Sequence, residues 1–200
     1  MTIYRIIYVM IPTYFNCKVA GLSYQKSWKV VGKPVIIKRK WYEKLFMKHK
    51  GGRLVIGESF ICNNKVNSNS IGTIQPCVFN IAIDGSFIKI GNNVGISGST
   101  INSATSVIID DNVTIGSGCL ITDTDSHPLL YEDRLADDMS KTKTSPVHVG
   151  EGAFIGARSI IMKGVIIGKH SIIGAGSVVT KSVPDNVVAC GNPAEIVRSL

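Results

Sequence analysis

A six-residue repeat of aliphatic side chains constrains the fold of this chain more than any other feature. Between residues 149 and 183 an aliphatic residue recurs at every sixth position: Val149, Ile155, Ile161, Ile167, Ile173 and Val179. A small or β-branched residue lies four positions after each of them, namely Ala153, Ser159, Val165, Ser171, Ser177 and Val183. A period of six fits neither an α-helix, with a period of about 3.6, nor an ordinary strand, with a period of about 2.

A chain that turns a corner every six residues accounts for this repeat. Three such hexads complete one triangular coil of about 18 residues, in which each aliphatic side chain points inward and stacks on its counterpart one coil away. Neighbouring coils then share parallel β ladders, and small residues fit where the chain bends. The repeat therefore predicts an all-β protein whose domain, residues 54–200, is a parallel β-helix. Spacing alone does not give the hand of the helix.

The repeat is interrupted once by a long protruding loop. The aliphatic positions continue through Ile121, but the next position is His127, and residues 128–146 contain no hexad. A loop of this length inside a compact repeat is usually functional. Earlier in the chain an Asn/Ser-rich turn is expected at 63–70, and a short C-terminal helix is predicted at 194–200.

Residues 1–53 are predicted to form an irregular N-terminal cap segment. They contain twelve Lys and Arg against Glu43 alone, so they carry 12 − 1 = +11, whereas the whole chain carries +8. This charge is either solvated surface or a face for an anionic membrane or glycolipid. The apolar residues 1–16 either cover the open end of the solenoid or lie peripherally in a membrane. No nucleic-acid-binding motif accompanies the charge, so nucleic acid is not expected as a partner.

The cysteines favour a cytoplasmic protein. Five are present, with no CxxC and no framework spacing, which indicates reduced thiols. Residues 3–11 are apolar, but Arg5 interrupts them and Pro12 follows, so no secretory signal is expected. No apolar run is long enough to span a bilayer.

Several segments carry a family resemblance. Residues 121–128 read Ile-Thr-Asp-Thr-Asp-Ser-His-Pro, residues 155–157 read Ile-Gly-Ala, residues 173–181 read Ile-Gly-Ala-Gly-Ser-Val-Val-Thr-Lys, and residues 191–193 read Gly-Asn-Pro. These segments resemble the hexapeptide-repeat O-acetyltransferases of the galactoside and maltose acetyltransferase type, closest to those associated with surface polysaccharides. The resemblance implies a left-handed β-helix and a homotrimer with active sites between neighbouring prisms. It also implies acetyl transfer from acetyl-CoA to a sugar hydroxyl.

Two residues match the catalytic positions of that family. His127 corresponds to its general base, since an imidazole with a pKa near neutrality can take the proton of a hydroxyl that attacks a thioester. The backbone N–H of Ala157 corresponds to its oxyanion donor, a group worth about 3 kcal/mol of barrier. From its spacing alone, His127 is equally well interpreted as a solvated residue of an Asx-rich turn.

Five residues match cofactor-binding positions by the same resemblance. Gly156, Ala175, Thr180 and Lys181 lie where the family binds CoA, and Lys181 offers a positive charge to a phosphate. Arg198 is the expected C-terminal phosphate partner. No metal is expected.

The acceptor-binding residues keep alternatives open. Asn102, a polar residue at a core position, either binds the acceptor or belongs to an internal Asn ladder. Asp123 and Asp125 hold acceptor hydroxyls, orient His127, or only form the turn. Arg134 either contacts an acidic sugar or pairs within the loop. The acceptor itself is expected to be a sugar or a lipid-linked glycan.

Two other functional classes use similar solenoids. A zinc hydratase needs about three converging His ligands. However, there is no His-x4-His spacing, and His148 and His170 are 22 residues apart, which is not a whole number of coils. A non-catalytic solenoid for binding or assembly explains the repeat, but it explains neither the loop beside His127 nor the segment around Lys181.

Overall fold

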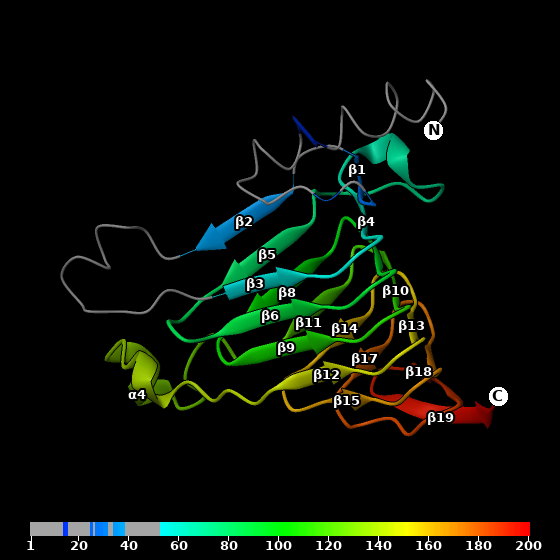
Figure 1. The fold of residues 1–200 in the computed structure, drawn as a ribbon. Coiled ribbons are helices and arrows are strands. Elements are labelled where there is room, and N and C mark those ends of the chain that lie inside the picture. The colour runs from blue at the N-terminus through cyan, green and yellow to red at the C-terminus, as the bar shows by residue number, and fades with distance from the viewer. Residues whose placement is uncertain (1–13, 16–24, 26, 32–33, 39–52) are drawn as a thin grey trace, which may run out of the picture.

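The computed structural model describes residues 14–15, 25, 27–31, 34–38 and 53–200. The strands among them form a three-sided prism of stacked coils (Figure 1). Three sheets make the three sides. Sheet A contains β1 (Lys29–Val31), β4 (Ile61–Asn63), β7 (Gly95–Ser97), β10 (Thr114–Ser117), β13 (Phe154–Ile155), β16 (Ile172–Ile173), β18 (Val187–Gly191) and β19 (Ala194–Ser199). Sheet B contains β2 (Val35–Lys38), β5 (Val78–Ile81), β8 (Thr100–Ser103), β11 (Leu120–Thr122), β14 (Ile160–Ile161) and β17 (Val178–Val179). Sheet C contains β3 (Arg53–Ile56), β6 (Phe87–Ile90), β9 (Ser106–Ile109), β12 (Val147–Val149) and β15 (Ile166–Ile167).

The pairing of strands confirms the predicted parallel β-helix. The chain passes from sheet A to B to C and back to A, and each strand pairs in parallel with the strand one coil away. Ile155 of β13 pairs with Ile173 of β16, and Ile161 of β14 pairs with Val179 of β17. These partners are separated by one predicted coil, so the hexad aliphatics stack in columns along the prism.

The inside of the prism is a continuous apolar core. The large side chains that are fully buried include Phe60, Phe79, Ile88, Ile101, Ile121, Ile155, Ile161 and Ile167. Serines fill the narrow corners, where each hydroxyl donates to a backbone carbonyl; Ser159 Oγ lies 2.7 Å from the Gly156 oxygen. Such bonds remove the cost of burying the hydroxyl.

Each corner of the prism is a tight turn, and we name the corners A/B, B/C and C/A after the sheets they join. At every C/A turn one residue adopts a positive φ: Ser59, Asn93, Asn112, Gly152, His170 and Asn186. At the A/B corner Gly156 has no room for a side chain, because a Cβ would lie 2.5 Å from the Ala175 nitrogen one coil away. The repeated small residues are therefore set by the bends, as the sequence predicted.

Two segments leave the regular coils. An insert at residues 64–77, with the 3-10 helix η2 (Val66–Ser68), leaves the A/B corner between β4 and β5. The loop 128–146 leaves the B/C corner between β11 and β12 and contains α4 (Tyr131–Leu135) and η3 (Met139–Lys141). Figure 1 shows α4 standing away from the prism. The loop was predicted, whereas only the turn at 63–70 was predicted for the insert.

The predicted C-terminal helix is wrong, because residues 194–199 form strand β19. This strand pairs antiparallel with β18, and Ala189 faces Ile196. The pairing covers the edge that β18 would otherwise expose, and Ile196 and Val197 are β-branched residues that favour strands. A helix of seven residues would gain too few hydrogen bonds to compete.

The N-terminal segment enters the solenoid before Leu54. Strand β1 pairs with β4, and β2 pairs with β5, so both extend sheets that continue through the whole prism. Trp28 is buried, and its Nε1 donates to the Gly57 oxygen at 2.7 Å. Most of residues 1–53 lie outside the described residues, so their expected roles as a cap or a membrane contact stay predictions. No helix in the described ranges is long and apolar enough to cross a membrane.

The inward column of aliphatics gives a matched pair of substitutions. Ile167 is fully buried, whereas its neighbour Ile166 is 53% exposed. We expect Ile167→Ala to lower the free energy of unfolding by about 2–5 kcal/mol, because it removes buried methyl groups and leaves a cavity. Ile166→Ala should change it by about 0.5 kcal/mol or less. Urea unfolding measures both, and equal losses would contradict the column.

Candidate functional site

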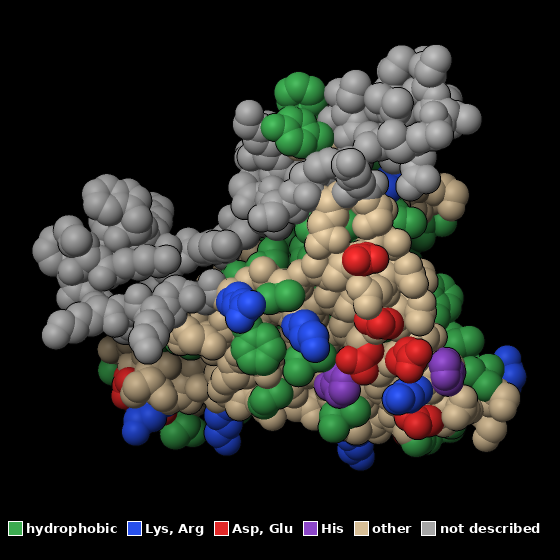
Figure 2. Space-filling view, viewed as in Figure 1, with side chains coloured by type: hydrophobic (Ala, Val, Ile, Leu, Met, Phe, Trp, Pro, Cys, Tyr) green, Lys and Arg blue, Asp and Glu red, His purple; other side chains and the backbone are tan. Residues whose placement is uncertain are grey.

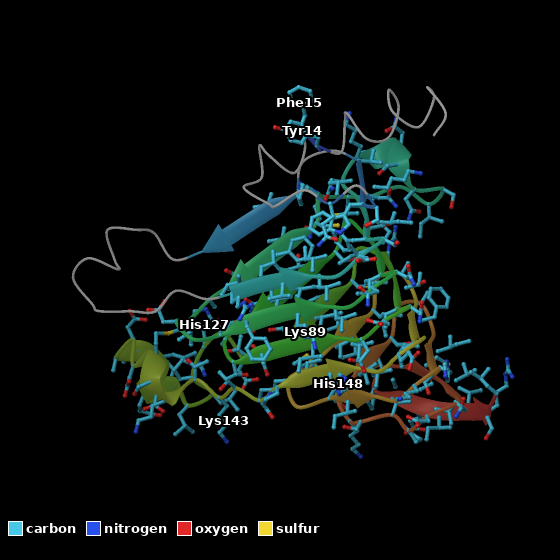
Figure 3. The ribbon with its side chains drawn as sticks, viewed as in Figure 1. Tyr14, Phe15, Lys89, His127, Lys143 and His148 are labelled. Carbon is cyan, nitrogen blue, oxygen red and sulfur yellow. The ribbon has the colours of Figure 1, made fainter. Side chains whose placement is uncertain are left out.

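His127 lies at the B/C corner, at the start of the protruding loop. The base of this loop is closed by a bridge between Thr124 and Thr144 and by the Asp125 N–H, which donates to the Lys143 oxygen at 3.0 Å. His127 itself is exposed. Figure 3 shows it where the prism meets the loop that carries α4. A rigid turn therefore presents an accessible imidazole.

A groove of about 490 Å³ lies beside this turn. Its walls come from sheet B, from the turn before His127 and from the loop; Asn80, Asn102, Ala104, Ser126, Met139 and Thr142 are among its lining residues. None of its described lining residues is charged. Thr142 Oγ1 is buried here without a hydrogen-bond partner among the described residues. The groove thus has apolar walls and a few neutral polar groups.

The position of Asn102 is compatible with both roles that the sequence left open, acceptor binding and an internal Asn ladder. It lines the groove, as an acceptor-binding residue would. It also belongs to a ladder, because its Oδ1 accepts from Asn80 Nδ2 at 2.7 Å and its Nδ2 donates to Thr122 Oγ1 at 3.1 Å. The ladder fixes the orientation of the amide at the wall of the groove.

The contacts of Asp123 support the third alternative that its sequence left open, turn formation. Its side chain is fully buried. Oδ1 accepts from the Ala104 N–H at 2.6 Å, and Oδ2 accepts from the Thr105 N–H at 2.7 Å and from Ser103 Oγ at 3.2 Å. Charge-assisted bonds of this kind hold the turn that connects β8 to β9.

Asp125 and Arg134 also have partners within the chain. Asp125 Oδ1 pairs with Lys163 Nζ at 2.6 Å, while its Oδ2 is buried with no hydrogen bond in the described part of the chain. Arg134 Nη1 donates to the oxygens of Pro128 and Leu129. The guanidinium therefore ties α4 to the start of the loop, which supports the alternative of pairing within the loop, and contact with an acidic sugar stays a prediction.

The A/B corner presents two unpaired backbone N–H groups. Gly156 N donates to the Ile173 oxygen and Arg158 N donates to the Ser117 oxygen, but in the described ranges nothing accepts from the N–H of Ala157 between them. The same holds for Ala175, which lies one coil further along. Neighbouring coils are about 4.8 Å apart, so the N–H groups of Ala157 and Ala175 lie one above the other along this corner.

A second groove, of about 310 Å³, opens at this corner. It lies on sheet A between the insert and β13, and Ile71, Gly95, Gly116, Phe154 and Ala157 are among its lining residues. Cys119 lies nearby, but burial raises the pKa of its thiol, and its Sγ is 3.2 Å from the Gly156 oxygen. This thiol stays protonated near pH 7 and is not an activated nucleophile.

The remaining predicted residues lie further along the prism. Thr180 and Lys181 are exposed at the B/C corner, after β17. Arg198 is exposed on β19. No three His, Cys, Asp or Glu residues of the described ranges converge in a way that could hold a metal ion.

The predicted residues thus divide between two corners. His127 and Lys181 lie at the B/C corner, whereas Ala157 and Ala175 lie at the A/B corner. The whole width of sheet B separates the two groups within one chain. Sequence reasoning found both groups but missed the groove under the insert, which no repeat or motif marks.

Comparisons with known proteins match this arrangement. Residues 146–181 match the hexapeptide repeat of succinyl-transferase. The chain is 36% identical over 120 residues to galactoside O-acetyltransferase of Escherichia coli (strain K12), covering 57% of this chain and 58% of that protein. It is 38% identical over 117 residues to Protein CapG of Staphylococcus aureus, covering 56% of this chain and 66% of that protein. The chain therefore spans about three fifths of the curated relatives it matches.

A solved structure shares the fold as well. A galactoside acetyltransferase in complex with coenzyme A superposes with a TM-score of 0.54 at 30% identity, covering 73% of this chain and 65% of that chain. The fold and site define a left-handed parallel β-helix built from hexapeptide repeats. Within that class, the chain is a hexapeptide-repeat protein similar to the galactoside acetyltransferases, which confirms the resemblance seen in its sequence.

Proposed function

We propose that this protein transfers an acetyl group from acetyl-CoA to a hydroxyl of a sugar or glycolipid acceptor. The observation that carries the proposal is the N–H of Ala157, which lines a groove and has no acceptor in the described part of the chain. An unpaired donor at a tight turn is preorganised for a carbonyl oxygen that gains negative charge. The relatives named galactoside O-acetyltransferase and galactoside acetyltransferase in complex with coenzyme A support the same chemistry.

The A/B corner is proposed to bind acetyl-CoA, the donor of the acetyl group. Ala157 N–H would donate to the thioester carbonyl oxygen, and Ala175 N–H, one coil away, would donate to the first amide carbonyl oxygen of pantetheine. Gly156 lets these two turns approach closely, since any side chain there would strike the next coil. Thr180, Lys181 and Arg198 are proposed to hold the nucleotide, with the cations contacting phosphate.

His127 is proposed as the general base for the acceptor hydroxyl. As the hydroxyl oxygen attacks, the imidazole takes its proton, the ester bond forms and the carbon–sulfur bond breaks. The proton then passes to the departing thiolate, so no covalent enzyme intermediate is needed. The neutral groove beside His127, with the fixed amide of Asn102, is proposed to hold the acceptor. Asp125 Oδ2, which has no hydrogen bond in the described part of the chain, is proposed to orient the imidazole.

A second copy of the chain is proposed to complete the site. In a threefold assembly whose axis runs along sheet B, the A/B corner of one protomer meets the B/C corner of the next. Sheet B suits this position, because its strands from β5 to β17 contain no charged residue. Sheet A carries the insert, and sheet C carries Lys89 and His148 (Figure 3).

The C/A corner is unsuited to a polyanionic cofactor. Acidic side chains gather along this edge (Figure 2), and its turns contain Glu58, Asp110, Asp111, Glu151 and Asp185 against one cation, Lys169, which pairs with Glu151. Their charge repels phosphate groups. The electrostatics of the prism therefore favour nucleotide binding at the two corners that hold the proposed catalytic groups.

Removing the imidazole tests the general base. We expect His127→Ala to keep the fold and to lower kcat by about 100-fold or more, the range of general-base catalysis. The measurement is the release of free thiol from acetyl-CoA with a panel of nucleotide-linked, lipid-linked and free sugars. His148→Ala is the control, since His148 pairs with Asp110 at 2.8 Å, away from the groove. An unchanged rate for His127→Ala removes this residue from the mechanism.

Removing the backbone donor tests the oxyanion site. Ala157 and Arg158, whose φ is 61°, form a turn in which only the second residue has a positive φ, and such type II turns accept proline at the first position. Ala157→Pro therefore deletes the N–H with little change in the turn, and should lower kcat by about 100- to 1,000-fold. Glu151→Pro makes the same change at the C/A corner, before Gly152. Equal losses in both variants would mean a general effect on the fold.

A further inference from the structure

The insert at residues 64–77 is fixed along the A/B corner. At its base, Asn64 Oδ1 accepts the Cys77 N–H at 2.8 Å. Further along, Ser117 Oγ donates to the Gly72 oxygen at 2.6 Å, so the insert reaches down to the coil directly before Ala157. The insert therefore forms a fixed wall beside the N–H groups of Ala157 and Ala175.

The groove of about 310 Å³ lies between this wall and sheet A. Two of its apolar side chains are exposed, Ile71 by 64% and Phe154 by 43%, and its described lining residues include no charge. Gly95 opens one end, because a Cβ at this position would meet no atom within 4 Å. The groove has room, apolar walls and a free hydrogen-bond donor at Ala157.

The geometry of a thioester bound at Ala157 directs its acyl chain into this groove. This step rests on the proposed function. The carbonyl carbon of a thioester carries oxygen, sulfur and the acyl chain in one plane. With the oxygen at Ala157 N–H and the sulfur directed along the column toward Ala175, the acyl chain points the opposite way, toward the insert.

We propose that this groove is an acyl pocket that takes neutral acyl groups longer than acetyl, such as propionyl and butyryl. A methyl group is about the size of a water molecule, which occupies about 30 Å³ in the liquid. Acetyl therefore leaves most of the groove unfilled, whereas further methylenes contact Ile71 and Phe154. The insert closes the far end and limits the length of the chain.

Binding measured without any acceptor tests the pocket. Isothermal titration calorimetry compares CoA, acetyl-CoA, propionyl-CoA and butyryl-CoA. Each buried methylene is worth roughly fourfold in affinity, so butyryl-CoA, with two more methylenes, should bind about 15-fold more tightly than acetyl-CoA. In Gly95→Leu, whose side chain fills the groove, this gain should disappear. Ser106→Leu is the control, because it adds the same side chain to the first residue of β9 on sheet C and should preserve the gain.

Each outcome separates the pocket from the proposed function. If CoA binds but its affinity does not rise with chain length, the acyl pocket is refuted and the acetyl transfer proposal stands. If affinity rises equally in Gly95→Leu, the chain lies elsewhere and the pocket is again refuted. If CoA itself does not bind, the proposed function fails and the pocket fails with it.

Discussion

Stacking of one aliphatic side chain on another, repeated at every face of the prism, is the interaction on which this structure depends. It requires the chain to turn after six residues, and each turn requires either a small residue or a positive φ. Gly156 shows how tight the turns are, since a Cβ there would lie 2.5 Å from the Ala175 nitrogen. The same tight turns leave the N–H groups of Ala157 and Ala175 without an acceptor among the described residues, so the proposed donor site follows from the way the core is packed.

The two segments that interrupt the repeat, loop 128–146 and insert 64–77, each contribute a wall to one of the two grooves. Loop 128–146 presents His127 beside a neutral groove, and insert 64–77 builds a wall above Ala157. The loop leaves the prism at the B/C corner, and the insert leaves it at the A/B corner. The proposed sites for the donor and the acceptor are therefore grooves that these two segments help to form.

The sequence predicted what depends on periodicity and on local motifs. The hexads gave the β-helix, because stacking acts at a fixed spacing, and the motif around His127 marked the loop. Residues whose environment is set by distant coils were predicted less well. Asp123 is held by three residues that precede it by about one coil, an arrangement that has no local signature. Strand β19 formed instead of a helix because the edge of β18 was available.

If His127 of one copy acts with Ala157 of the next, two variants that each lack one of these groups should complement each other when they are mixed. Each pure variant, His127→Ala or Ala157→Pro, carries its defect at every site, so its kcat should be lower by about 100-fold or more. If the site lies between copies, every mixed trimer contains one intact site, so refolding the two variants together in equal amounts should restore about one quarter of the full activity. If a single chain supplied both groups, every site in the mixture would keep a defect. A mixture that forms mixed trimers but stays inactive would therefore contradict the account.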